Sequence, residues 1–264
     1  MQSSALASRP ERVIIPALLG LSFVAWLMTS QLSDGAMRVG ILTGETEMHD
    51  TGMTGMDMGG HAMAFPLFIA TWVVMMIAMM FPAIVPVILM VHRWAKSRGL
   101  ASRVTIPFVG GYLLLWSAAG FTAYAFLVLL ENNLGSGPGL VRLGGALVAA
   151  AGFYQFTPLK DACLRQCRSP LSLLMTHAPA LQRGVVGRVV VGARHGAYCL
   201  GCCWGLMTVL VLIGMMNLAW MAAVAAVIVT EKALSSGTGA SRLFGLVLLI
   251  FGGSMLISGV PLFV

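Results

Sequence analysis

The sequence predicts an all-α fold, a polytopic bundle of about seven transmembrane helices with six as the alternative. Of its 264 residues, 58% are hydrophobic and 9% are charged, whereas soluble domains carry about 25% charged residues. Long uncharged runs recur along the chain, and a helix of about 20 such residues crosses a bilayer. A water-soluble globule is therefore excluded. The net charge of +7 is not evidence for a nucleic-acid partner, because membrane proteins collect Lys and Arg in cytoplasmic loops. We expect no nucleic-acid partner.

The first element is a short polar tail followed by an apolar run at residues 13–29. No small-residue cleavage site follows this run, so we expect a retained transmembrane helix and not a secretory signal peptide. We divide the chain into a tail and first helix (1–33), an extracytoplasmic loop rich in Met, His and Gly (34–64), and a helical bundle (65–264). The further apolar runs, in chain order, are residues 65–91, 104–130, 140–156, 196–215, 218–229 and 243–260.

The charges predict the orientation of these runs. Seven crossings place the basic residues on one side, which should be cytoplasmic. They are Arg9 and Arg12 at the N-terminus, the basic linker after the second run, the linker at residues 157–192, and Lys232 with Arg242 after the sixth run. Arg38 and Arg142 are exceptions. We therefore expect a cytoplasmic N-terminus, with the Met/His/Gly-rich loop outside. The short sixth run is also compatible with a re-entrant hairpin, which would leave six spans.

The segment HGAYCLGCCWGLM, at residues 195–207, contains three of the five cysteines of the chain. On a helix, His195, Cys199, Cys203 and Met207 follow one another at i, i+4 spacing, and Cys202 lies on nearly the same face. Thiolate, imidazole and thioether groups are ligands for copper(I), zinc or an iron–sulfur centre. The segment therefore predicts a stripe of soft metal ligands.

Two further cysteines, Cys163 and Cys167, lie in the 157–192 linker at i, i+4 spacing. The predicted topology places all five thiols at or near the cytoplasmic side, where a reducing environment disfavours structural disulfides. Neighbouring basic residues such as Arg165 and Arg168 favour the thiolate form. We hypothesise that these two cysteines and the segment around His195 converge on one ion, although the sequence leaves open whether they meet in space.

Packing is the alternative interpretation of the same segment. Free cysteine is often buried as a small apolar residue. Gly192, Gly196, Gly201 and Gly205 recur at about one-turn intervals, which is typical of a face where helices pack closely in lipid. Five cysteines on one side favour metal or redox chemistry over packing alone. Arg194 is expected to form an interfacial ion pair with Glu231 or Asp161.

The predicted outer loop carries a second set of soft ligands. Thioether and imidazole groups on a glycine-rich chain favour copper(I) over zinc, so we expect metal capture here, and the alternative is a linker whose methionines are incidental. The candidate ligands in and beside this loop are Met48, His49, Met53, Met56, Met58, His61 and Met63.

Methionines also form two adjacent i, i+4 pairs in the second apolar run. Met75 pairs with Met79, and Met76 pairs with Met80. One interpretation is a thioether track that carries a soft ion into the membrane through Met75 and Met79. The other is that flexible methionines fill gaps between helices kinked by Pro82.

Three motifs together carry a resemblance to a known family. They are W-x-x-M-M-x-A-M-M-x-P at residues 72–82, Y-x-x-x-P-L-K-x-x-C-L-x-x-C-R-x-P at 154–170, and G-x-x-C-x-G-C-C-W-x-L-M at 196–207. Over residues 65–234 the chain resembles a bacterial family of integral membrane proteins described as metal-binding. The resemblance implies a multi-pass inner-membrane protein that handles a metal, most often copper. It implies no established reaction, and it does not extend to the Met/His loop.

The sequence thus predicts a membrane protein that binds a soft metal ion for handling, delivery or transport, with copper(I) ahead of zinc or iron–sulfur. Its expected partners are the lipid bilayer, the metal ion and a metallochaperone or membrane complex. No catalytic residue is assigned, and the lack of a P-loop argues against ATP-driven pumping by this chain. Two alternatives stay open: a thiol-disulfide oxidoreductase in which Cys163 or Cys167 resolves a Cys199–Cys202 pair, and an assembly subunit of a larger membrane enzyme.

Overall fold

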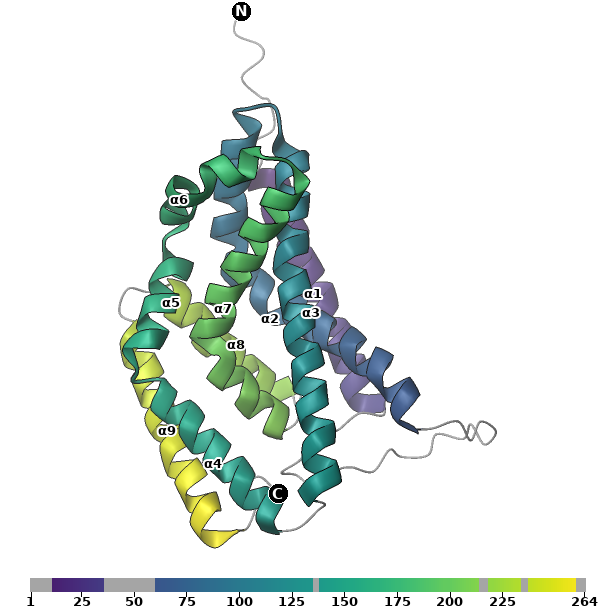
Figure 1. The fold of residues 1–264 in the computed structure, drawn as a ribbon, viewed down its shortest axis with the longest axis vertical. Coiled ribbons are helices and arrows are strands. Elements are labelled where there is room, and N and C mark those ends of the chain that lie inside the picture. The colour runs from purple at the N-terminus through teal and green to yellow at the C-terminus, as the bar shows by residue number, and fades with distance from the viewer. Residues whose placement is uncertain (1–10, 36–59, 135–137, 214–217, 234–236, 260–264) are drawn as a thin grey trace, which may run out of the picture.

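The computed structural model describes residues 11–35, 60–134, 138–213, 218–233 and 237–259, and all regular structure in these residues is helical (Figure 1). The all-α prediction is therefore confirmed. The helices are α1 (Glu11–Gly35), α2 (Gly60–Lys96), α3 (Ala101–Leu134), α4 (Pro138–Tyr154), α5 (Pro158–Arg168), α6 (Pro170–Gln182), α7 (Val185–Ile213), α8 (Leu218–Ala233) and α9 (Gly237–Ser258).

Each of the seven predicted apolar runs coincides with a helix, namely α1 to α4 and α7 to α9. Five of these helices, α1, α2, α3, α7 and α9, are long and apolar enough to cross a membrane. A sixth candidate span combines α4 and α5, which meet at an angle of 63°. Helix α8, with 16 residues, is too short to pass the same test. The described residues thus contain five or six candidate spans, fewer than the seven predicted and compatible with the six-span alternative.

The polar linker at residues 157–192 contains two complete helices and the beginning of a third. Thr157 caps α5 by accepting a hydrogen bond from the backbone N–H of Lys160, and Pro158 occupies the first turn, where its missing N–H costs nothing. Ser169 separates α5 from α6 without a side-chain capping hydrogen bond, and Pro170 begins α6. Helix α5 is therefore a separate helix of 11 residues, and the helical conformation is interrupted at both of its ends.

Helix α7 begins earlier than the apolar run predicted, at Val185 and not near Gly196. Cys199 lies 14 positions after Val185 in a helix of 29 residues, which is about 21 Å along its axis at 1.5 Å per residue. The three clustered cysteines therefore lie about halfway along α7, whereas the sequence analysis expected them at its beginning.

Two helix pairs pack with close backbone contact, α3 with α7 and α4 with α9 (Figure 1). A Cβ atom on Gly192 of α7 would overlap the carbonyl oxygen of Phe108, and one on Gly111 of α3 would overlap that of Val189. These two glycines therefore allow the backbones of α3 and α7 to approach. Gly192 and Gly196 thus lie where α7 packs against α3, whereas Gly201 and Gly205 face Cys163 of α5 and Ala151 of α4.

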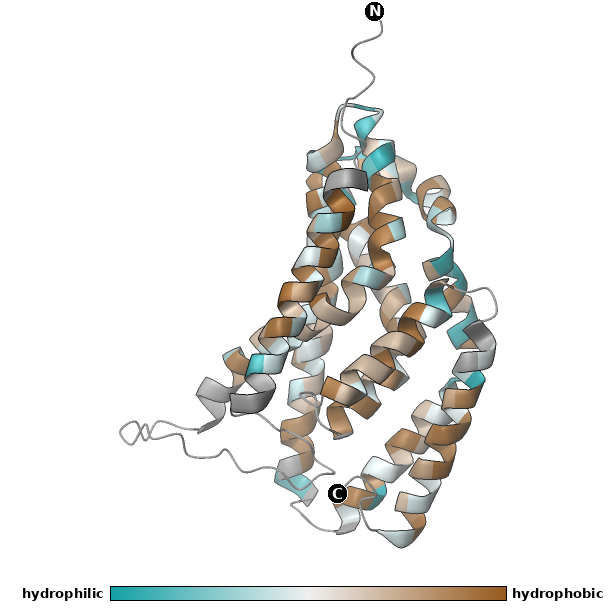
Figure 2. Cartoon of the chain, turned by 180° about the vertical axis from the view of Figure 1, so that it is seen from behind, coloured by the Kyte–Doolittle hydropathy of each residue, from teal (hydrophilic) through white to brown (hydrophobic). Residues whose placement is uncertain are grey.

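The centre of the bundle is formed largely by α2, which continues through Pro82 and two further prolines from Gly60 to Lys96. The two methionine pairs of this helix are buried, with at most 2% of each side chain exposed. Hydrophobic residues make up most of the helices, whereas hydrophilic residues gather at one end of the bundle and along α5 (Figure 2). Helix α5 is thus richer in hydrophilic residues than the helices around it.

Candidate metal site

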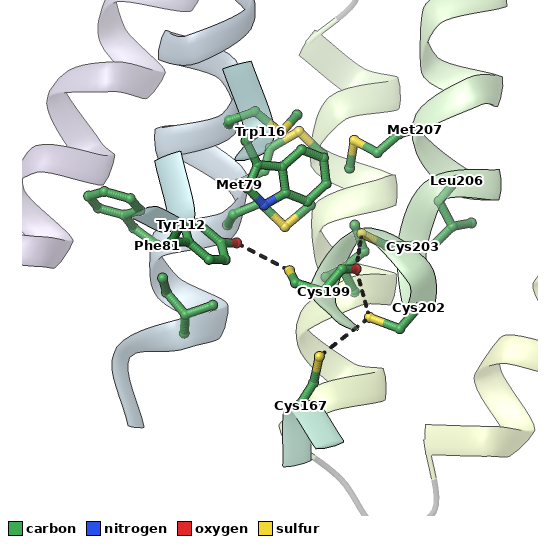
Figure 3. Packing of buried hydrophobic residues seen from close by; sticks show 14 of the residues in the cluster. Met79, Phe81, Tyr112, Trp116, Cys167, Cys199, Cys202, Cys203, Leu206 and Met207 are labelled. Carbon is green, nitrogen blue, oxygen red and sulfur yellow. Dashed lines mark hydrogen bonds between the residues drawn. The ribbon is translucent and has the colours of Figure 1, made fainter. Parts of the chain in front are cut away.

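Cys199 lies at the point where α3, α7 and α8 meet. Its side chain is fully buried, at 0% exposure. The hydroxyl of Tyr112 on α3 is 3.2 Å from the Cys199 sulfur (Figure 3). The ammonium group of Lys232 on α8 donates a hydrogen bond to the same sulfur at 3.0 Å. A cation at this distance stabilises negative charge on the sulfur, so Cys199 is placed to act as a thiolate.

The next two cysteines of α7 lie within one turn of Cys199. The thiols of Cys202 and Cys203 donate hydrogen bonds to the Cys199 carbonyl oxygen at 3.0 Å and 2.9 Å. Both side chains are 1% exposed. These bonds require protonated thiols, so binding of a metal ion would replace the protons and free both sulfurs to rotate.

Cys167 of α5 joins this group from a distant part of the sequence. Its sulfur is 3.8 Å from the sulfur of Cys202 (Figure 3). Cys163, one turn earlier on α5, places its sulfur against the backbone of Gly201, since a Cβ on that glycine would lie 2.7 Å from it. All five cysteines are free thiols. The structure thus brings the cysteines of the linker and those of α7 together, as the convergence hypothesis requires.

His195 lies one turn before Cys199 and is 1% exposed. The rings of Phe108 and Tyr112 lie 6.1 Å and 6.2 Å from the imidazole, measured between centroids. Its Nδ1 atom has no hydrogen-bond partner among the described residues. A buried polar atom without a partner is costly, which makes this nitrogen available to a ligand. Met207, 3% exposed, belongs to the same buried cluster (Figure 3).

We compared this arrangement with the requirements of a metal ion. Among the described residues, no group of three or more His, Cys, Asp or Glu side chains is already arranged around a common point. Metal–sulfur bonds of about 2.3 Å allow one ion to bridge sulfurs up to about 4.6 Å apart, and the 3.8 Å between Cys167 and Cys202 is within that limit. The site thus offers two sulfurs at bridging distance, with Cys199, Cys203 and His195 buried beside them.

The other predicted ligands belong to α2 or fall outside the described residues. Met75 and Met79 are buried in α2, at 2% and 1% exposure, in the hydrophobic cluster that also contains the α7 cysteines. His61 and Met63 belong to the beginning of α2, but their side chains are outside the described part of the structure. The remaining loop ligands also lie outside the described residues, and they are Met48, His49, Met53, Met56 and Met58.

A buried polar network next to the cysteines was not predicted. The Lys160 ammonium contacts the Glu231 carboxylate at 2.7 Å and the Ser241 hydroxyl at 2.6 Å, and it also binds Gln155. Lys160 and Glu231 are each 1% exposed. Glu231 thus pairs with Lys160, and Arg194 is exposed. The expected ion pair of Arg194 with Glu231 is therefore wrong, and among the described residues Arg194 forms none with Asp161 either.

Two residues that contact Cys199 were also missed as site residues. Lys232 follows Glu231 at the end of an apolar helix, and a charged residue in that position is a signal for function. Tyr112 gives no such signal, because an isolated tyrosine in a transmembrane run is ordinary. Its role depends on the close approach of α3 to α7, which the sequence does not specify.

Comparison with known families gives one match. The family model described as "PpoB2: Copper chaperone" matches residues 69–255, which include all five cysteines but not the Met/His loop. No curated protein and no solved structure matches the chain. Because the match covers well over half of the sequence, the chain belongs to the PpoB2 copper chaperone family.

Proposed function

We propose that this protein carries copper(I) as cargo on Cys167 of α5 and the cysteines of α7 and delivers it to a partner protein. The observation that carries the proposal is the 3.8 Å distance between the sulfurs of Cys167 and Cys202, because these residues are 35 positions apart and meet in a buried, apolar part of the bundle. Thiolate and thioether ligands favour copper(I) over the harder divalent ions. The family match supports copper as the metal.

A buried positive charge lies beside the cysteines. Copper(I) bound by two thiolates leaves one net negative charge, and a buried net charge is costly unless it is compensated. Lys232, whose ammonium group is 3.0 Å from the Cys199 sulfur, supplies a compensating positive charge.

We further propose that copper enters from the Met/His/Gly-rich loop and passes the methionines of α2. Met75 and Met79 support such a route because they are part of the buried cluster that contains the cysteines. The distribution of basic residues supports a bacterial inner membrane orientation with a cytoplasmic N-terminus. Delivery would then take place on the cytoplasmic side, where thiols remain reduced.

Copper content after anaerobic purification in detergent tests the proposal. We expect copper to co-purify with the wild-type chain and to be lost in the Cys199→Ser/Cys202→Ser/Cys203→Ser variant. Deletion of residues 48–58 should reduce copper loading in cells but not the copper bound after reconstitution. Met175→Leu, on an exposed side chain of α6, is the control for loss of a soft ligand away from the site. Equal copper in the wild type and the triple cysteine variant would contradict the proposal.

One observation also favours a second function, thiol-disulfide exchange. A disulfide needs sulfurs about 2.05 Å apart, and a modest rotation would bring Cys167 and Cys202 from 3.8 Å to that distance. Trapping of a mixed disulfide between the Cys167→Ser variant and a cellular protein would support this function. If the protein delivers copper at its full rate under strictly reducing conditions, a disulfide step in that delivery is excluded.

A further inference from the structure

The five cysteines differ in their access to the surface. Cys199, Cys202 and Cys203 are at most 1% exposed, and Cys167 is 8% exposed. Cys163 alone is partly exposed. An ion held by the four buried sulfurs is therefore out of reach of an acceptor protein, and delivery needs a sulfur that contacts both the buried group and the surface.

Cys163 fulfils both conditions. Its sulfur lies against Gly201, the residue immediately before Cys202, and it is one helical turn from Cys167 on α5. The surface around it is open, since Leu159 is 62% exposed and Arg165 is exposed as well. Helix α5 is also the most hydrophilic part of this flank of the bundle (Figure 2). Cys163 thus lies between the buried cysteines and an exposed, charged stretch of α5.

We propose that Cys163 is the hand-over residue, through which copper(I) leaves the buried cysteines for an acceptor with soft ligands. This inference rests on the proposed function. In the transfer step, the sulfur of Cys163 forms a bond to the ion while one buried sulfur releases it. The proton lost by the Cys163 thiol is accepted by the released thiolate, and copper remains in the +1 state. A thiol of the acceptor then displaces Cys163 in the same manner, and its proton passes to the released Cys163 thiolate.

Copper transfer to a soluble chelator tests the proposal separately from copper binding. The full-length protein is loaded with copper(I) anaerobically in detergent, and bathocuproine disulfonate is added in a stopped-flow spectrometer. Cys163→Ser should keep the copper content of the wild type but slow the transfer by about tenfold or more, which corresponds to about 1.4 kcal/mol in the barrier. Cys163→Met, which restores a soft ligand, should recover part of the rate.

A second variant moves the Cys163 sulfur without removing it. Gly201→Ala places a methyl group where that sulfur lies, and we expect slower transfer with all five thiols and the copper content preserved. Gly253→Ala on α9, which has no atom within 4 Å of the added carbon, is the matched control and should behave as wild type.

The possible outcomes distinguish this inference from the proposed function. Transfer at the wild-type rate in Cys163→Ser would overturn the hand-over role and leave copper binding intact. Loss of copper from that variant would also overturn it, because Cys163 would then be a ligand of the resting site. A wild-type protein that binds no copper would overturn both the proposed function and the hand-over role.

Discussion

The sulfur of Cys167 on α5 lies 3.8 Å from the sulfur of Cys202 on α7, and this contact joins a short polar helix to the buried centre of the bundle. Helix α5 is fixed along one face, since its buried residues are Lys160, Leu164 and Cys167. Lys160 binds Glu231 of α8 at one end of this face, and Cys167 contacts Cys202 at the other. The position of the Cys167 sulfur therefore depends on a salt bridge two turns away.

Cys167→Ser and Cys202→Ser should each weaken copper(I) binding, and the double variant should lose little more than either single variant. The reason is that one ion bridging both sulfurs makes the two effects non-additive. Competition with a chromophoric copper(I) chelator measures the affinities. Additive losses in the double variant would show that the two sulfurs do not share an ion.

Lys160→Met should destabilise the protein by about 3–5 kcal/mol, because it leaves the Glu231 carboxylate buried without its partner. The double variant Lys160→Met/Glu231→Met should recover much of this loss, since no unpaired charge remains. Thermal unfolding of the detergent-solubilised protein, followed by circular dichroism, compares the three proteins. If the single and double variants unfold at the same temperature, the salt bridge does not hold α5 in place.

Lys232→Leu removes the charge without adding a soft ligand, and it should weaken copper(I) binding by about tenfold or more, because a hydrogen bond to a charged group contributes about 1.5–3 kcal/mol. Lys232→Arg keeps the positive charge beside Cys199 and should weaken binding less. Chelator competition again gives the affinities. Tighter binding in Lys232→Leu would contradict charge compensation and would indicate that the ammonium group repels the incoming ion.

Gly111→Ala should destabilise the bundle by about 1–3 kcal/mol, the usual cost of overpacking, because the added carbon would overlap the backbone of Val189. Gly110→Ala provides the control at the adjacent position of α3, where no atom lies within 4 Å of the added carbon. The difference between the two unfolding temperatures reports the packing of α3 against α7. Equal temperatures would mean that this close contact is absent in solution.

Much of the helical framework follows from the sequence, because each apolar run is long enough to be recognised by composition alone. The points at which individual helices begin and end were harder to predict. Helix α7 begins at Val185, inside a segment whose arginines indicated a linker. Arg188 is accommodated there because its guanidinium donates to the carbonyl oxygens of Leu181 and Arg103. A hydropathy scale assigns Arg188 the cost of a charged residue, and it takes no account of hydrogen-bond partners from other parts of the chain.

The candidate site was predicted in part. The i, i+4 spacing placed Cys199 and Cys203 on one face of α7, and this is a local property of a helix. The contact between Cys167 and Cys202, and the salt bridge of Lys160 with Glu231, depend on how α5 packs against α7 and α8. These residues are 35 and 71 positions apart, so sequence spacing gives no information about either contact.

X-ray absorption at the copper edge tests the central claim most directly. The protein is loaded with copper(I) under anaerobic conditions, and the spectrum is compared with that of a Cys167→Ser/Cys202→Ser variant. We predict copper in the +1 state with sulfur as the dominant ligand in the wild type, and fewer sulfur neighbours in the variant. A first shell of nitrogen or oxygen, or identical sulfur shells in both proteins, would contradict copper binding by the cysteines of α5 and α7.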